Sequence, residues 1–243
     1  MDHQTLHDHI KHEHGLSAFS TYLKEFIYGG NDGIVTTFAV VAGFSGANLG
    51  EHALNFSIVT VLLFGLANLF ADGAAMGLGN YLSLRSEKKL YANFYAKEYA
   101  ETQKSFNFEY DETVLLFQEN GFSEEDAKSL TQIVSKNTDF WVKFMVQHEC
   151  NMNEPDDNPF YCGLATFGSF VFFGIIPLIP YFFTINTQST FIYSSFFTAG
   201  ALSLLGIFRA YTTKDSYIIA IGETLLIGGT AATLAYVVGA LFK

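Results

Sequence analysis

The stretch ALNFSIVTVLLFGLANLFADGAAMGLGNYL, residues 53–82, decides the fold. It is long enough to cross the hydrocarbon core of a bilayer, which takes ~20 mostly apolar residues in a helix. Four other stretches meet the same requirement, namely residues 26–49, 161–184, 189–208 and 216–242. Because the alternating pattern of a β-barrel is absent, the backbone of each span must be satisfied within a helix. The sequence therefore predicts an all-α membrane protein with five transmembrane helices.

An acid-rich insert separates the second span from the third. Residues 85–160 hold fifteen of the 24 Asp and Glu residues, in a chain whose net charge is −11. The chain thus divides into a His-rich tail (1–20), two spans (21–84), a small helical insert (85–160) and three further spans (161–243). Acidic side chains gathered beside membrane spans are typical of proteins that handle cations. We expect no nucleic-acid partner, because phosphates favour a basic surface.

The basic residues predict how the chain lies in the membrane. They gather beside the N-terminus, the insert and the loop between the last two spans, as Lys11, Lys24, Arg85, Lys88, Lys89, Arg209 and Lys214. By the positive-inside rule, these segments are cytosolic and the C-terminus lies on the far side. No cleavable signal peptide is recognised, and Cys150 and Cys162 form no metal or redox motif.

Four residues of the second span recur at intervals of four and share one helical stripe: Asn68, Asp72, Met76 and Asn80. A thioether between a carboxylate and two carboxamides suits a transition metal, because sulfur selects softer cations than Ca²⁺ or Mg²⁺. The alternative is a polar packing seam in which Met76 only fills space. Beside the stripe, Gly73-x-x-x-Gly77 predicts the close approach of another helix.

Two further acids lie within predicted spans, where an ionisable group is costly and by default indicates function. Asp32 lies among Gly29, Gly30 and Gly33, which let another helix or backbone approach its carboxylate. It either contacts a cation or caps a neighbouring backbone group. Glu223 is interpreted as a buried acid hydrogen-bonded within the bundle, with a proton-relay role as the alternative.

The insert is predicted to continue the second span as a helix. Its aromatic residues repeat with a helical period, and Glu98 falls in the middle of their stripe, which consists of Tyr91, Phe94, Tyr95, Tyr99 and Phe106. Residues 123–126 form a capping box that opens a helix ending near Lys136. A last helix is expected over residues 138–152, before a break at 153–159.

Five glutamates of the insert are candidate metal ligands, with two thioethers and an imidazole nearby: Glu98, Glu101, Glu109, Glu112, Glu149, Met145, Met152 and His148. Taken singly, each glutamate pair fits a solvated helix face; together they predict an acidic metal site. The Glu-x-x-His motif of ferritin-type di-iron sites is absent, which argues against a ferroxidase. The histidines of the tail either gather metal or belong to a disordered polar terminus; they are His3, His7, His9, His12 and His14.

In combination, several motifs resemble the vacuolar iron transporter family over residues 20–242. They are Tyr28-Gly-Gly-Asn-Asp32-Gly33, Ala42-Gly-Phe-Ser-Gly46, Met76-Gly-Leu-Gly-Asn-Tyr81, Ser86-Glu87 and Pro177-Leu-Ile-Pro180-Tyr181. The resemblance implies five transmembrane helices per subunit and a two-fold homodimer with the ion path at its interface. Because plant-type members carry a cytosolic helical metal-binding domain between spans two and three, it also implies that role for the insert.

The resemblance further implies roles for individual residues. Asp32 and Met76 match membrane-embedded metal ligands of the family, and the five glutamates of the insert match those of its metal-binding domain. Two positions depart from the pattern. Asn153 stands where a further glutamate is expected, with Glu154 next to it. Asn68 stands where relatives often have an acid, although Asp72 supplies one a turn later.

These observations predict a transporter, not an enzyme, that moves Fe(II) out of the cytosol in exchange for protons and carries no prosthetic group. Metal ligands must be deprotonated, so each bound ion displaces protons, and no nucleotide-binding motif is present. Mn(II) is the alternative cargo, and Co(II) or Zn(II) also fit the ligands. The rival function is a membrane-tethered metal buffer. A vacuolar membrane and a bacterial inner membrane both fit the sequence.

Overall fold

The computed structural model describes residues 22–48, 57–183 and 187–242, and within these ranges the chain is helical and contains no strand. The predicted all-α class is thereby confirmed. The five histidines of the predicted tail lie outside the described residues, as do parts of the loops after the first and third spans.

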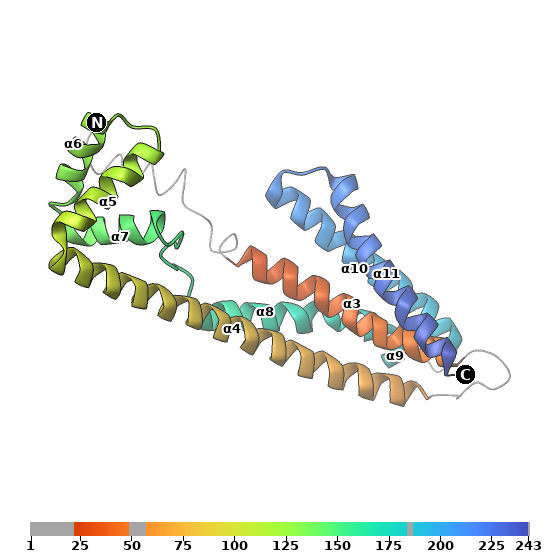
Figure 1. Ribbon diagram of the computed structural model, residues 1–243. Helices are drawn as coiled ribbons and strands as arrows, with labels where there is room; N and C mark the ends of the chain where they lie inside the picture. Colours follow the sequence, from red (N-terminus) through yellow and green to blue (C-terminus); the bar gives the residue numbers. More distant parts are fainter. Residues whose placement is uncertain (1–21, 49–56, 184–186, 243) are drawn as a thin grey trace, which may run out of the picture. The chain divides into compact units, whose positions relative to one another are not determined.

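The chain forms two compact units, and the long helix α4 (Ile58–Lys104) supplies residues to both (Figure 1). The second unit, Leu82–Pro159, covers nearly the same residues as the predicted insert. The first unit also contains α3 (Leu23–Ala47), α8 (Pro159–Gly174), η1 (Ile176–Leu178), α9 (Ile179–Phe183), α10 (Thr187–Thr213) and α11 (Tyr217–Leu241). The second adds α5 (Phe106–Glu119), α6 (Glu124–Val134) and α7 (Thr138–His148) to its part of α4.

Four helical segments in the described part of the chain are long and apolar enough to cross a membrane: Ile58–Lys104, Pro159–Phe183, Ser189–Thr213 and Tyr217–Leu241. They correspond to four of the five predicted spans, and they support an integral membrane protein. The first predicted span corresponds to α3, which has 25 residues but is not among the four. Its polar residues Glu25, Asn31 and Asp32 lower its hydropathy. The fifth span therefore stays a prediction.

Helix α4 is too long to lie entirely within a membrane. At 1.5 Å per residue its 47 residues extend roughly 70 Å, against about 30 Å for a hydrocarbon core. Apart from Asp72, the charged residues of α4 begin with Arg85, after the apolar half. Because charged side chains are costly in hydrocarbon, the half of α4 that belongs to the second unit is the part that leaves the membrane.

Glycines allow α3 and α4 to pack against α8. A Cβ added at Gly29 of α3 would lie 2.6 Å from the carbonyl oxygen of Thr166, and one at Gly33 would meet the backbone of Phe170. On α4, a Cβ at Gly77 would lie 2.8 Å from the carbonyl oxygen of Gly163. The close approach predicted for these glycines is thus confirmed. Helix α8 is the shared partner of α3 and α4.

The third predicted span is broken rather than continuous. Helix α8 ends at Gly174, and the chain passes through η1 before α9 begins. Pro177 and Pro180 explain the break, because proline has no N–H to donate and clashes with the preceding turn. The Ser194 hydroxyl of α10 donates a hydrogen bond to the Pro177 carbonyl oxygen at 2.6 Å. A polar side chain of the neighbouring helix α10 thus hydrogen-bonds to a backbone carbonyl oxygen of the broken segment.

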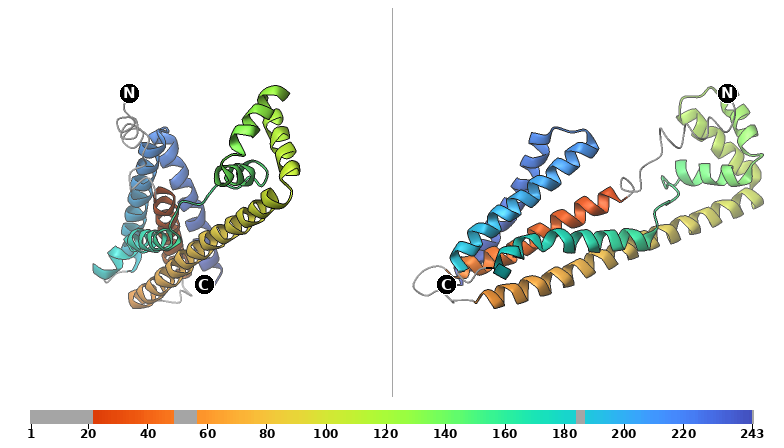
Figure 2. Two further views of the ribbon diagram at one scale, coloured as in Figure 1. Left: turned by 90° about the vertical axis from the view of Figure 1, so that its left-hand side faces the viewer. Right: turned by 180° about the vertical axis from the view of Figure 1, so that it is seen from behind.

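Helices α10 and α11 are antiparallel neighbours in both views (Figures 1 and 2). Their contact again uses a glycine, since a Cβ at Gly206 would lie 2.8 Å from the Cα of Ile221. The Thr224 hydroxyl lies 3.1 Å from the Leu202 carbonyl oxygen across the same contact. The apolar core of this unit combines buried residues of α3, α8 and α10, including Ile34, Phe173 and Leu205.

The second unit has its own apolar contacts. Tyr91 of α4 packs on Val142 and Val146 of α7, while a second cluster joins α5, α6 and α7. The predicted capping box is confirmed, because the Ser123 hydroxyl accepts a hydrogen bond from the Asp126 backbone N–H at 3.2 Å.

Two helix boundaries in this unit differ from prediction. Phe106 begins α5, since α4 ends at Lys104, and the last helix ends at His148 rather than at 152. Asn151 has a φ of 53°, in the left-handed region, which no helix continues through. Met152 therefore lies beyond α7.

We predict that Gly29→Ala destabilises the first unit by about 1–3 kcal/mol, the usual cost of overpacking. The added methyl would meet the backbone of α8, which cannot move aside as a flexible side chain would. Thermal unfolding in detergent measures the effect. Gly168→Ala on α8 is the matched control, because an added Cβ there meets nothing within 4 Å. Equal melting temperatures for the two variants would contradict the packing argument.

Candidate functional site

Two acids of the first unit lie on different helices and within electrostatic reach of each other. Asp32 of α3 and Asp72 of α4 are both half-buried, and the charge of Asp72 acts on the Asp32 carboxyl. Thr36 does not shield Asp32, since its hydroxyl donates to the Asp32 backbone carbonyl oxygen at 2.8 Å. Two carboxylates within electrostatic reach in an apolar bundle repel one another unless a proton or cation lies between them.

The predicted stripe of α4 lies next to its packing face. Asn68, Asp72, Met76 and Asn80 are all half-buried, whereas Gly65, Leu69, Gly73 and Gly77 are buried. Asn80 belongs to the packing seam, because its amide donates to the Thr166 hydroxyl of α8 at 2.9 Å. The alternative of a packing seam therefore holds for one end of the stripe.

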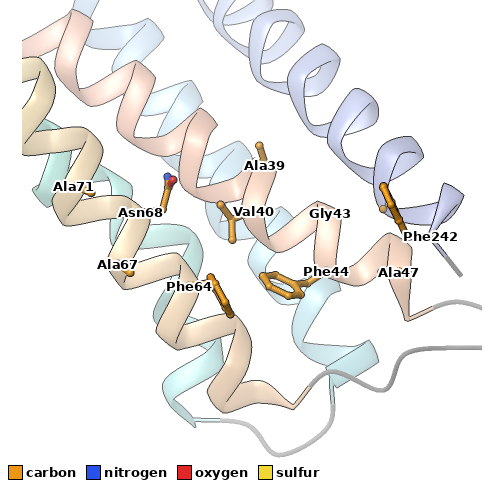
Figure 3. Close-up of a pocket in the computed structure, with 11 residues that line it drawn as sticks. Ala39, Val40, Gly43, Phe44, Ala47, Phe64, Ala67, Asn68, Ala71 and Phe242 are labelled. Atoms are coloured by element: carbon orange, nitrogen blue, oxygen red, sulfur yellow. The ribbon is translucent and has the colours of Figure 1, made fainter.

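Asn68 lines a cavity of about 740 Å³ between α3 and α4, with the end of α11 (Figure 3). Its side chain projects from α4 toward α3 (Figure 3). The other lining residues are apolar, among them Ala39, Phe44 and Phe64. Asn68 is thus the polar side chain of this cavity, one turn from Asp72.

Glu223 has a partner on the neighbouring helix. Its carboxylate accepts a hydrogen bond from the Arg209 guanidinium of α10. The expectation of a hydrogen-bonded acid is confirmed, but that of a buried acid is wrong, since 55% of the Glu223 side chain is exposed. The apolar pattern of α11 shows no sign of the arginine, which lies fourteen residues away in sequence.

Two glutamates of the second unit are almost completely buried. Glu98 of α4 is 1% exposed and Glu109 of α5 is 4% exposed. One oxygen of each, Oε1 of Glu98 and Oε2 of Glu109, is buried without a hydrogen-bond partner. A buried polar atom without a partner is costly, so these oxygens indicate a missing proton or ligand. The sequence placed Glu98 on the apolar face, and the structure confirms this.

The other three glutamates lie within electrostatic reach of this pair. Burial, together with the charges of Glu98, Glu112, Glu101 and Glu149, raises the pKa of Glu109 to about 7. Three helices therefore contribute to one acidic cluster: α4, α5 and the end of α7. In the described part of the chain, no three His, Cys, Asp or Glu side chains are close enough to hold an ion as they stand.

The sulfur and imidazole candidates lie in different places. Met145 is fully buried, and its sulfur lies 3.1 Å from the Thr113 hydroxyl, one helical turn from Glu109. His148 is exposed, and its ring lies 4.3 Å from that of Phe144 between centroids. Met152 lines a cavity of about 250 Å³ with Tyr91 and Lys143. Of the three, Met145 is the one that contacts α5 beside the acidic cluster.

Sequence reasoning missed two neighbours of the acidic cluster. The Lys97 ammonium lies 3.3 Å from Oε2 of Glu101 and 3.6 Å from Oε1 of Glu98. The Lys97–Glu101 spacing of four was a usable signal. Burial raises the pKa of the Cys150 thiol, as do the charges of Glu149 and Glu98. No sequence signal placed this thiol near Glu98, because the contact depends on how α7 packs on α4.

Comparison with known proteins agrees with this arrangement. The model of the VIT family matches residues 23–240. The chain belongs to the VIT family. The predicted family resemblance is thus confirmed over nearly the whole chain.

Named relatives of this VIT family chain come from apicomplexans and plants. The vacuolar iron transporter of Toxoplasma gondii is 33% identical over 95% of this chain and 78% of its own length. That of Plasmodium berghei is 31% identical over 99% of this chain and 89% of its own. Vacuolar iron transporter 1 of Arabidopsis thaliana is 28% identical over 96% of this chain and 90% of its own length. The alignments include the second unit as well as the spans.

We predict that the second unit of this VIT family chain loses stability as pH rises from about 4.5 to about 7. In the folded state Glu109 keeps its proton up to about pH 7, whereas the unfolded chain releases it near 4.5. Between these values the folded state binds more protons, so the free energy of unfolding falls with rising pH. The fluorescence of Trp141, the only tryptophan, reports unfolding of this unit.

Glu109→Gln should flatten this pH dependence and make the unit more stable than the native chain above pH 7. Asp111→Asn is the control, because Asp111 is an exposed acid of the same helix. An unchanged slope in Glu109→Gln would show that the stability of the unit does not depend on the Glu109 proton.

Proposed function

We propose that this protein is a transporter, not an enzyme, that moves Fe(II) out of the cytosol in exchange for protons. The observation that carries the proposal is the pair of acids, Asp32 and Asp72, that interact across two helices of an apolar bundle. A pair of this kind is satisfied by a cation or by protons, which are the two species exchanged. Its relatives, named vacuolar iron transporters, suggest the metal and a vacuolar membrane.

In this proposal the second unit collects Fe(II) on its glutamates. The unpartnered oxygens of Glu98 and Glu109 supply the first ligands, and Glu101, Glu112 and Glu149 turn inward to complete the site. Met145 adds a softer ligand from the α7 side. Loading of the metal displaces the Glu109 proton, so binding is coupled to pH. His148 and Met152 are secondary candidates.

The membrane path uses Asp32, Met76, Asp72 and Asn68. These residues lie on facing stripes of α3 and α4, and a homodimer would enclose the stripes at its interface. The N-terminus and the second unit face the cytosol, where the basic residues beside the spans are expected. Protons from the far side would displace the metal from Asp32 and Asp72. Glu223 is a less suitable proton relay, because its carboxylate is already paired with the Arg209 guanidinium.

Mn(II) remains the alternative cargo, since carboxylates accept it, and Co(II) and Zn(II) fit the same ligands. A membrane-tethered buffer is the alternative function, favoured by the second unit having its own apolar contacts. A buffer would not require two interacting acids between α3 and α4. Flux measurements separate the two functions.

We predict that purified protein in proteoliposomes takes up Fe(II) when a pH gradient is imposed, and that Asp32→Ala abolishes this uptake. Removal of one acid leaves the path without the charge that replaces the hydration of the metal. Asp215→Ala is the control, because Asp215 is an exposed acid at the turn between α10 and α11. Retained uptake by Asp32→Ala would remove this residue from the path. Binding without any uptake by the native chain would favour the buffer.

We predict that Met76→Ser shifts the preference of transport from Fe(II) toward Mn(II). The thioether is the soft ligand on the stripe, and a hydroxyl is a harder one. Competition between the two ions in the same liposomes measures the ratio. Leu78→Ser is the control, since Leu78 is an exposed residue of the same helix and lies off the stripe. An unchanged ratio in Met76→Ser would show that Met76 does not select the metal.

A further inference from the structure

Lys97 lies directly on the acidic cluster of the second unit. Its ammonium is 3.3 Å from Oε2 of Glu101, one helical turn along α4, and 3.6 Å from Oε1 of Glu98. The charge of Glu149 on α7 acts on it as well. The Lys97 side chain is 57% exposed, so it is held there by charge rather than by packing.

This lysine neutralises the cluster incompletely. Oε1 of Glu98 is buried and has no hydrogen-bond partner, because the ammonium at 3.6 Å is beyond hydrogen-bond distance. Oε2 of Glu109 is buried without a partner too. Two unpartnered buried oxygens in one cluster, one of them 3.6 Å from an exposed ammonium, indicate a place that a second cation fills better.

We infer that Lys97 is a built-in counter-ion that competes with the metal for Glu98 and Glu101 and thereby sets the affinity of the site. The inference rests on the proposed function, in which these glutamates bind the cargo. A divalent ion on Glu98 would have a positive charge a few ångströms away, and the two repel. The ammonium must turn outward as the metal binds.

A lowered affinity suits a transporter. A site on a transport route must bind its ion strongly enough to load it and weakly enough to release it. A cluster of five glutamates without a counter-ion would hold a divalent ion more tightly. Lys97 moderates that attraction without satisfying the unpartnered oxygen of Glu98.

The test is a titration of the full-length protein in nanodiscs with Co(II), followed by the fluorescence of Trp141. This tryptophan is buried in the same unit, and its Nε1 donates to Thr113, which lies beside Glu109. We expect Lys97→Gln to bind Co(II) about tenfold more tightly than the native chain. The gain should shrink as the salt concentration rises, because salt screens exposed charges. Lys97→Arg, which keeps the charge, should bind as the native chain does.

Lys128→Gln is the matched control. Lys128 pairs with Glu124 at the same spacing of four and is 58% exposed, but Glu124 does not belong to the cluster. Its loss should leave the affinity unchanged. A gain of the same size in Lys128→Gln would show that only the net charge of the protein matters, and the inference would fail.

Two further outcomes separate this inference from the proposed function. Equal or weaker binding in Lys97→Gln, with binding abolished by Glu98→Gln, would overturn the role of Lys97 and leave the glutamate site intact. Binding that Glu98→Gln does not change would remove the glutamate site and this inference with it, while transport through Asp32 and Asp72 is decided separately by the uptake measurement.

Discussion

A carboxylate that leaves water must find a proton or a cation, and this constraint acts on both units of the protein. In the first unit it applies to Asp32 and Asp72, which interact across two helices. In the second it applies to Glu98 and Glu109, whose buried oxygens lack partners. An acid in such a place costs stability unless its charge is compensated. The unpartnered oxygens are the basis for proposing that these acids bind exchangeable cations.

The acids of the first unit come together because α3 and α4 share a partner. Glycines of both helices pack on the backbone of α8, Gly29 at Thr166 and Gly77 at Gly163. Close approach of α3 and α4 to one helix brings their flanking stripes near each other, and those stripes carry Asp32 and Asp72. The glycines thus have a double effect. They provide the van der Waals contact that holds helices together in a membrane, and they let the two helices that carry the acids approach the same neighbour.

Sequence periodicity was a reliable guide where one helix decides the outcome. The apolar stretches, the capping box at Ser123 and the burial of Glu98 all follow from residues within one helix or its first turn. Periodicity failed where the packing of two helices determines which residues become neighbours. Nothing in the pattern of α11 points to Arg209, and only the packing of α7 on α4 brings Cys150 near Glu98. The early end of α7 depends on one left-handed residue, Asn151, which a wheel projection ignores.

In the proposed function, three positive species compete for the acidic cluster of the second unit: protons, the Lys97 ammonium and the metal. Glu109, with a pKa of about 7, exchanges its proton near neutral pH. Lys97 keeps its charge there, so its competition does not depend on pH. A metal that enters must therefore displace one competitor that varies with pH and one that does not. An affinity limited by both is weak at low pH and moderate at high pH, which favours transfer of the metal over storage.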